Sequence, residues 1–468
     1  MNIEEIKDIE DIKKIKDNLK KSPMFNLSLS SKELFHSNFI HWLASSYEDL
    51  FWYVIEQICG CNKDSWSNVQ GEFEYRRECE NFDFSVWKTN GKEKELILVI
   101  ENKVKSLPDE EQLKRYNEKI KKIKETEDDT TIKILLSLVE PNFKSDKIYW
   151  KHVSYQDYID SLEKASNTTF KNIPPKTKDY IYHRELIKDY IDFVKKLNFL
   201  KNYWIKEDRK EDSPKLIKYM KELRIDDLRQ KIICSTIERK LKEKLMKEDG
   251  TGDYFVLNST KSKDLKELEK KKEKEEEKKK NENRIIERIK DFDDKQKPVI
   301  FTNTGYGRSG AFVELKFIVK KEYIPTVFAD KHPYKNGTAF VVQLQNGILN
   351  LGIELLGGTK LDKSIDNDKN MDFSPFVKET IGEDGNFYSD FFTKENKTEK
   401  ISKNERKYYT NYNSFEDTFF YRNKKLKDLE ELKDYSLNSI VDLFISYIPK
   451  EKNKELLCTV DDLLEMSK

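Results

Sequence analysis

Apolar runs mark the interior of the first half of the chain. Residues 96–100 read Leu-Ile-Leu-Val-Ile, and residues 131–139 form a second, mostly apolar run that contains Lys133 and Ser137. Such runs, bounded by charge, are typical of strands that are buried on both faces of a sheet. Residues 110–124 lie between them and carry apolar side chains at helical spacing: Leu113, Tyr116, Ile120 and Ile123. Strand, helix and strand in this order predict a right-handed parallel crossover.

A further strand should pair with the first run. Residues 82–87 alternate like a strand and Asn90-Gly91 is a turn signal, so we expect an antiparallel hairpin with residues 95–100. A loop of three or five residues places Asp83 directly opposite Glu101, with Cβ atoms about 4.5–5.5 Å apart. A two-residue turn places these two side chains on opposite faces. We therefore predict a loop of odd length.

Helical periodicity surrounds this core, and residues 69–77 have the pattern of a first strand. The segments with helical periodicity are residues 1–20, 48–61, 155–162 and 178–199, with two more helices in 212–247. Residues 261–297 differ, because 17 of the 20 residues from Lys261 to Lys280 are charged and both signs are mixed. Such a segment buries too little apolar surface to form a core, so we interpret it as a solvated helical linker.

Beyond the linker the pattern predicts a mixed α+β domain. Its expected strands are residues 298–301, 311–319, 338–344 and 348–355, and residues 437–448 are a closing helix. Residues 305–310 match Gly-x-Gly-x-x-Gly, but a strand follows instead of a helix, which argues against a dinucleotide site. The segment is interpreted as a flexible hairpin.

Charge returns where the first buried run ends. Glu101 and Lys103 are two residues apart and share a face of the strand. Two carboxylates as close as Asp83 and Glu101 repel each other unless a cation lies between them, and hard oxygen ligands suit Mg²⁺ or Mn²⁺. Lys103 can orient an attacking water and offset charge on the transition state. The pattern predicts metal-dependent phosphodiester hydrolysis; the alternative is a solvent-facing strand end beside a surface lysine.

Three motifs together carry a resemblance to a known family. Asp83, the triplet Glu101-Asn102-Lys103, and Gln112 with Tyr116 resemble, in order and spacing, the PD-(D/E)XK nuclease superfamily and its RecB-like branch with a Gln-x-x-x-Tyr element. Residues 33–43, with Glu-x-x-His-Ser before an apolar helix, look like the opening helix of a bacterial group of this superfamily. The resemblance covers roughly residues 30–155.

The resemblance implies an α/β fold with an αβββαβ restriction-endonuclease-like core. It also implies metal ligation by Asp83, Glu101 and the Asn102 carbonyl, with Mg²⁺ or Mn²⁺ as the cofactor and DNA as the substrate. Glu33 is either a third acidic ligand or part of a capping box with Ser30.

Three more residues have two interpretations each. Gln112 and Tyr116 lie on one helix face and are candidate catalytic residues, although Tyr116 also lies beside the apolar stripe and could belong to the core. His36 contacts a phosphate or is a buried structural residue.

Composition limits the function classes. The 88 Lys and Arg residues against 87 Asp and Glu leave a net charge of +1, so any basic nucleic-acid face must be local. The five cysteines are too scattered for a zinc site or a disulfide framework. We find no secretory or membrane-spanning segment and expect a cytoplasmic protein that does not bind a membrane.

The predicted organisation has four parts: a nuclease domain (1–205), a helical extension (206–260), the charged linker (261–297) and a C-terminal α+β recognition or regulatory domain (298–468). The expected activity is that of a Mg²⁺-dependent deoxyribonuclease that acts on DNA, in defence against phage or foreign DNA. A partner protein or a homo-oligomer is left open. The alternatives are a catalytically inactive nucleic-acid-binding protein of the same fold and an interaction scaffold.

Overall fold

The fold is that of a computed structural model. It describes the following residues, to which every statement below applies: 9–31, 33–61, 63, 71–91, 93–124, 130–172, 178–206, 214–246, 254–258, 294–307, 310–320, 338–345, 348–355, 418–425, 436–448, 454–455 and 457–466. The chain divides into two compact units, Met1–Ile233 and Cys234–Lys468. The boundary falls within helix α9 (Asp226–Met246). Each unit is described by itself.

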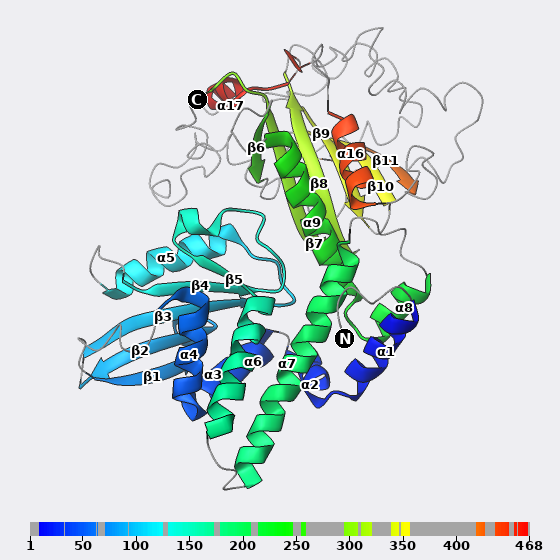
Figure 1. The fold of residues 1–468 in the computed structure, drawn as a ribbon. Coiled ribbons are helices and arrows are strands. Elements are labelled where there is room, and N and C mark those ends of the chain that lie inside the picture. Colours follow the sequence, from blue (N-terminus) through cyan, green and yellow to red (C-terminus); the bar gives the residue numbers. More distant parts are fainter. Residues whose placement is uncertain are drawn as a thin grey trace. The chain divides into compact units, whose positions relative to one another are not determined.

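The first unit is built on a five-stranded mixed sheet in the order β1-β2-β3-β4-β5. The strands are β1 (Glu72–Arg77), β2 (Phe84–Asn90), β3 (Glu93–Lys103), β4 (Ile132–Ser137) and β5 (Lys151–Ser154). The first three run antiparallel, whereas β3, β4 and β5 run parallel. Helix α5 (Glu110–Lys124) forms the predicted crossover between β3 and β4 (Figure 1).

Helices cover both faces of this sheet. Helix α5 packs on one face over a small core that includes Leu96, Val99 and Leu113. The other face carries the larger core, to which the remaining helices contribute (Figure 1). They are α1 (Ile9–Lys21), α2 (Pro23–Ser31), α3 (Glu33–Ser46), α4 (Glu48–Cys59), α6 (Tyr155–Asn172), α7 (Lys178–Trp204) and α8 (Pro214–Glu222). The sheet is thus buried on both faces, as its apolar runs predict.

The β2–β3 hairpin corrects the prediction of an odd-length loop. Asn90 pairs with Glu93, so the turn has two residues. A β-bulge then shifts the register, because Trp87 pairs with Leu96 but Val86 pairs with Leu98. The extra residue is Ile97, which lies in the larger core together with its neighbour Leu98.

The bulge restores the register that an odd loop would have given. A bulge adds one residue to one strand and so exchanges the faces beyond it. The pair Phe84 and Ile100 follows the bulge, and the same register continued by one residue sets Asp83 opposite Glu101. The predicted loop length is wrong, and the bulge is the reason that the two carboxylates still meet.

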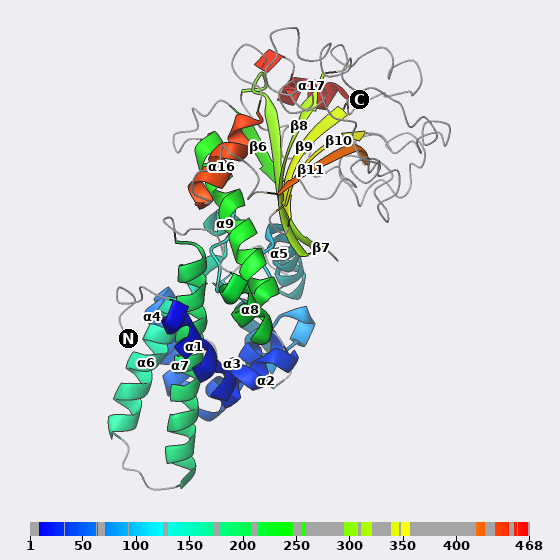
Figure 2. The ribbon, with the colours of Figure 1, turned by 90° about the vertical axis from the view of Figure 1, so that its right-hand side faces the viewer.

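The second unit holds a six-stranded sheet in the order β11-β10-β9-β8-β7-β6. The strands are β6 (Phe255–Asn258), β7 (Val299–Gly307), β8 (Gly310–Val319), β9 (Thr338–Gln345), β10 (Ile348–Leu355) and β11 (Thr418–Lys425). Only the β6–β7 pair is parallel within this described sheet. Helix α9 and helix α16 (Leu437–Ser446) lie against one face, and α17 (Val460–Met466) ends the described chain (Figure 2).

Most predicted elements are found, with differences at short segments. Gly307 pairs with Gly310, so the Gly-x-Gly-x-x-Gly segment is a hairpin between β7 and β8. The sequence did not predict α2, α17 and three strands of four to eight residues: β5, β6 and β11. Most of the charged linker lies outside the described residues, so the four-part organisation stays a prediction. None of the helices in the described ranges is long and apolar enough to cross a membrane.

Candidate metal-dependent active site

The site is built where β3 ends beside the segment that leads into β2. Glu101 is 1% exposed and Lys103 is 8% exposed, and the Lys103 Nζ atom lies 2.7 Å from Glu101 Oε1. Asp83 precedes β2 and is partly buried. Its Oδ2 atom accepts a hydrogen bond of 2.8 Å from the main-chain N–H of Asn102. The strand register thus brings two carboxylates and one ammonium group together, largely out of water.

The two carboxyl groups share an electrostatic environment that favours a bound positive charge. Burial, followed by the charge of Asp83, raises the pKa of Glu101 to about 7. Burial also raises the pKa of Asp83, although the hydrogen bond from the Asn102 N–H and the charge of Lys103 act in the opposite direction. Burial by itself lowers the pKa of Lys103, but the Glu101 carboxylate more than offsets this and the pKa is raised. The lysine therefore stays charged, and one positive charge faces two acids.

An unsatisfied oxygen shows that the residues fit a divalent cation. Glu101 Oε1 accepts from Lys103, but Glu101 Oε2 is buried and meets no hydrogen-bond donor among the described residues. Buried carboxylate oxygens are normally paired, because an unpaired one costs free energy. Hard carboxylate oxygens are the ligands that Mg²⁺ and Mn²⁺ prefer. The described ranges contain no group of three or more His, Cys, Asp or Glu residues that could hold a metal ion, so Asp83 and Glu101 would be joined by main-chain oxygen and water.

Helix α5 contributes the next layer of contacts. The Gln112 Nε2 atom donates to Glu101 Oε1 over 2.9 Å and to the Tyr116 hydroxyl oxygen over 2.8 Å. Leu113 and Ile120 point into the small core and are fully buried. This is the orientation that the helical spacing predicts. Gln112 touches the acid, whereas Tyr116 reaches the site through Gln112.

Tyr116 also holds the segment that carries Asp83. Its hydroxyl donates to the main-chain oxygen of Asn81 over 2.8 Å. Glu78, Glu80 and Asn81 have φ angles of 49°, 56° and 59°, a left-handed region that non-glycine residues rarely adopt. Strained backbone of this kind persists only when its surroundings fix it. The hydrogen bond from Tyr116 is one such contact, and the residue that accepts it, Asn81, lies two positions before Asp83.

The structure places Glu33 beside the site in a supporting position. Its Oε1 atom accepts from the main-chain N–H groups of Lys105 and Ser106 and from the Ser106 hydroxyl. The capping box with Ser30 is wrong, because Ser30 lies inside α2 and Glu33 begins α3. The carboxylate instead binds the chain that leaves β3. The third-ligand role of Glu33 stays a prediction for which the described metal-binding groups give no support.

His36 is buried, and two tyrosines that sequence reasoning missed lie near it. His36 is 1% exposed, and its Nδ1 atom lies 3.0 Å from the Tyr190 hydroxyl. Tyr155 donates a hydrogen bond to Asn102 Oδ1. Both tyrosines lie on amphipathic helices, where a buried tyrosine looks like an ordinary core residue in the sequence. His36 has no contact with the carboxylates, which favours its structural interpretation.

Comparison with known proteins agrees with this geometry. A family model for the PD-(D/E)XK nuclease superfamily matches residues 60–198, a range that contains Asp83, the Glu-Asn-Lys triplet, Gln112 and Tyr116. Residues 60–198 are therefore similar to the PD-(D/E)XK nuclease superfamily. No curated protein and no solved structure matches the chain.

Similarity to the PD-(D/E)XK superfamily suggests the class of chemistry. It indicates a nuclease, a nucleic-acid substrate and the use of divalent metal ions, and the α/β fold of the first unit is consistent with it. The match names no branch of the superfamily, so the RecB-like assignment stays a prediction. The second unit lies outside the matched range.

Proposed function

We propose that the protein is a Mg²⁺-dependent deoxyribonuclease whose metal ligands are Asp83, Glu101 and the main-chain carbonyl of Asn102. The observation that carries the proposal is the buried Glu101 Oε2 atom, which meets no donor in the described chain and lies beside a second carboxylate. A structural acid would be neutralised by donors, whereas a metal ligand must keep an oxygen available.

The chain's own residues have separate roles in this proposal. Lys103 stays protonated beside Glu101, where it offsets negative charge on the scissile phosphate as charge develops. Gln112 fixes the rotamer of Glu101, and Tyr116 fixes the strained segment before Asp83. When bound, the cation would supply Lewis-acid polarisation of a phosphate oxygen and a more acidic water.

DNA is proposed as the substrate from the superfamily resemblance. Defence against phage or foreign DNA is proposed because the chain carries a second unit in addition to the one with the candidate site, and we assign recognition to that second unit. The net charge of +1 gives no global attraction to nucleic acid, so binding would rest on local contacts.

The test is a cleavage assay on the full chain with plasmid, linear duplex, single-stranded DNA and RNA. Each substrate is incubated with Mg²⁺, with Mn²⁺ and with EDTA. The proposal expects cleavage of DNA that needs the cation and disappears in Asp83→Asn. Cleavage of RNA alone would show that the substrate is RNA and not DNA. Cleavage by folded Asp83→Asn at the wild-type rate would show that the assigned site is wrong.

A further inference from the structure

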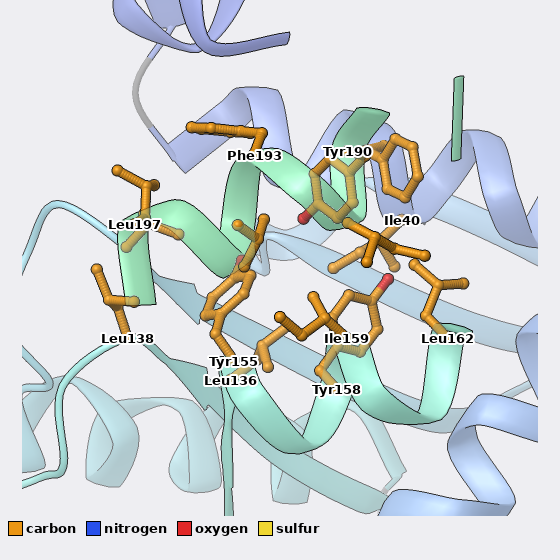
Figure 3. Close-up of a cluster of buried hydrophobic side chains, with 14 of the residues drawn as sticks. Ile40, Leu136, Leu138, Tyr155, Tyr158, Ile159, Leu162, Tyr190, Phe193 and Leu197 are labelled. Carbon is orange, nitrogen blue, oxygen red and sulfur yellow. The ribbon is translucent and has the colours of Figure 1, made fainter. Parts of the chain in front are cut away.

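A second set of polar groups lies on the opposite face of β3 from the carboxylates. The side chain of Asn102 alternates with Glu101 and Lys103 along the strand, so it points away from them into the larger core, where it is 1% exposed. Tyr155, the first residue of α6, donates to Asn102 Oδ1. Tyr190 on α7 hydrogen-bonds to Tyr155. Figure 3 shows both tyrosines among apolar side chains.

With the Asn102 amide oriented as in the structure, counting protons gives the direction of each hydrogen bond in this set. A hydroxyl has one proton and an amide oxygen only accepts. Tyr155 donates its proton to Asn102, so the Tyr155 oxygen accepts the proton of Tyr190. The Tyr190 oxygen must then accept from His36 Nδ1, which lies 3.0 Å away. His36 is therefore the Nδ1–H tautomer, and its buried Nε2 atom, an unprotonated acceptor, has no partner within the described ranges.

The amide orientation of Asn102 is supported independently on its other side. Asn102 Nδ2 donates to Ser37 Oγ over 3.4 Å, and Ser37 Oγ donates to the main-chain oxygen of Glu33 over 3.4 Å. The Asn102 side chain thus accepts from α6 and donates toward α3. Rotating the amide would turn its oxygen toward Ser37 Oγ, whose proton is donated to Glu33.

This buried set meets the site at one main-chain group. The N–H of Asn102 donates to Asp83 Oδ2, and Asp83 lies outside the β2 ladder, which ends at Phe84. The orientation of Asp83 therefore depends on where Asn102 is held. Glu33, His36 and Ser37 lie on one face of α3, at spacings of three and four residues, and all three join the support of this segment.

We propose that Tyr155 is a positioning residue: with Tyr190 and His36 it holds Asn102 so that the Asn102 main chain keeps Asp83 aimed at Glu101. The activity part of this inference rests on the proposed nuclease function. Tyr155 makes no hydrogen bond to either carboxylate and acts through Asn102. Removing outer contacts of metal ligands typically lowers metal affinity or activity by about 10- to 100-fold.

Helix α6 offers a matched control. Tyr158 is buried in the same core, three residues after Tyr155, but its hydroxyl has no hydrogen-bond partner in the part of the chain that is described. Tyr155→Phe and Tyr158→Phe each remove one buried hydroxyl from the same helix. Only the first removes a donor to Asn102.

The experiment compares these two variants with the wild-type full chain. Tyr155→Phe should lower the single-turnover cleavage rate and the affinity for Mn²⁺ by about 10- to 100-fold, while the KM for DNA stays unchanged. Hydrogen exchange in the peptide that covers residues 97–104 should speed up, because the Asn102 N–H loses its fixed position. Tyr158→Phe should leave all of these values at wild-type levels.

Two further measurements keep the test decisive. Nitrogen chemical shifts of the five histidines in the wild type should include one neutral Nδ1–H ring that does not titrate down to about pH 5, and a His36 ring of the other tautomer would overturn the proposal. If Tyr155→Phe does not fold, Tyr190→Phe replaces it and should show the same increase in exchange.

The exchange measurement also separates this proposal from the nuclease assignment. If the wild type cleaves nothing but exchange rises only in Tyr155→Phe, the nuclease function fails and the positioning role stands. Unchanged exchange and Mn²⁺ affinity in folded Tyr155→Phe would overturn the positioning role, whatever the wild type cleaves.

Discussion

Two buried glutamates, one in each unit, have opposite surroundings. Glu238 on α9 is 1% exposed, and both of its carboxylate oxygens accept hydrogen bonds. Its Oε1 atom accepts from Thr302 over 3.1 Å and lies 3.2 Å from Lys242 Nζ, and its Oε2 atom accepts from Thr304 over 2.8 Å. Glu238 therefore has a structural role, because its carboxylate joins helix α9 to strand β7.

Glu101 is equally buried but only half satisfied. Its Oε1 atom has Lys103 and Gln112 as partners, whereas its Oε2 atom has none in the described chain and a second acid lies beside it. Folding alone would not select this arrangement, because the unpaired oxygen and the like charge both cost free energy. Both acids are buried, so burial does not distinguish them. What separates the structural acid from the candidate metal ligand is whether both carboxylate oxygens have hydrogen-bond partners.

The largest expected effect comes from removing one of the two site carboxylates. Glu101→Gln or Asp83→Asn takes away a negative charge and one carboxylate oxygen, so cleavage should fall to the level of the EDTA control. Glu238→Gln is the matched substitution in the other unit and should leave cleavage unchanged, while lowering the free energy of unfolding by about 1–3 kcal/mol. Single-turnover assays and urea unfolding on the three variants check both halves. Equal activity loss in Glu238→Gln would break the comparison.

Lys103→Ala should have the next largest effect. It removes one group that offsets transition-state charge, which typically lowers the rate by about 10²–10³-fold. Cation binding should persist or tighten, since a neighbouring positive charge is gone. Rates at saturating DNA, together with Mn²⁺ titrations, measure the two effects separately. A variant that loses cation binding along with activity would show that Lys103 supports the ligands instead.

The pH dependence of stability sharpens the comparison without any assay of activity. The pKa of Glu101 is raised from 4.5 to about 7, so between these values the folded protein holds a proton that the unfolded chain has released. The free energy of unfolding should therefore fall as pH rises through this window, by roughly 3 kcal/mol in total. The loss should be complete above about pH 7.

Glu101→Gln provides the control for that window. Urea unfolding in EDTA at about pH 5 and about pH 8 should show a larger decrease for the wild type than for Glu101→Gln. Mg²⁺ should restore stability to the wild type at the higher pH, since it binds the ionised acid. Parallel pH profiles for the two proteins would mean that Glu101 does not titrate in this range.

The smallest effect is expected at Tyr116. Tyr116→Phe keeps the ring in the small core but removes the hydroxyl bond to Asn81, worth about 1 kcal/mol, so the rate should fall by about 5- to 10-fold. Tyr158→Phe again serves as a control. Wild-type rates for Tyr116→Phe would show that the strained segment before Asp83 is held without it.

The sequence predicted the sheet and the acids better than the turn that aligns them. The run at residues 96–100 and the Glu-Asn-Lys triplet mark the end of β3 because burial and charge change there abruptly. The bulge at Ile97 left no trace, since in a continuous apolar run a residue facing either core looks the same. Residue type therefore could not show which residues of the two strands share a face across the hairpin.

The support of Asn102 was equally hidden. Tyr155 and Tyr190 lie 53 and 88 residues after it, and a tyrosine on an amphipathic helix looks like ordinary core. Their hydroxyls gained a role only when β5, a strand of four residues, set α6 beneath β3. Short strands give too few residues for a periodicity, which is also why β6 was not predicted.

Calorimetric titration of Mg²⁺ and Mn²⁺ into the metal-free full chain tests the central claim most directly, with Glu101→Gln and Glu238→Gln measured alongside the wild type. The account predicts that the wild type and Glu238→Gln bind the cation with the same affinity and that Glu101→Gln loses binding while staying folded by circular dichroism. Cation binding by folded Glu101→Gln with wild-type affinity would contradict it.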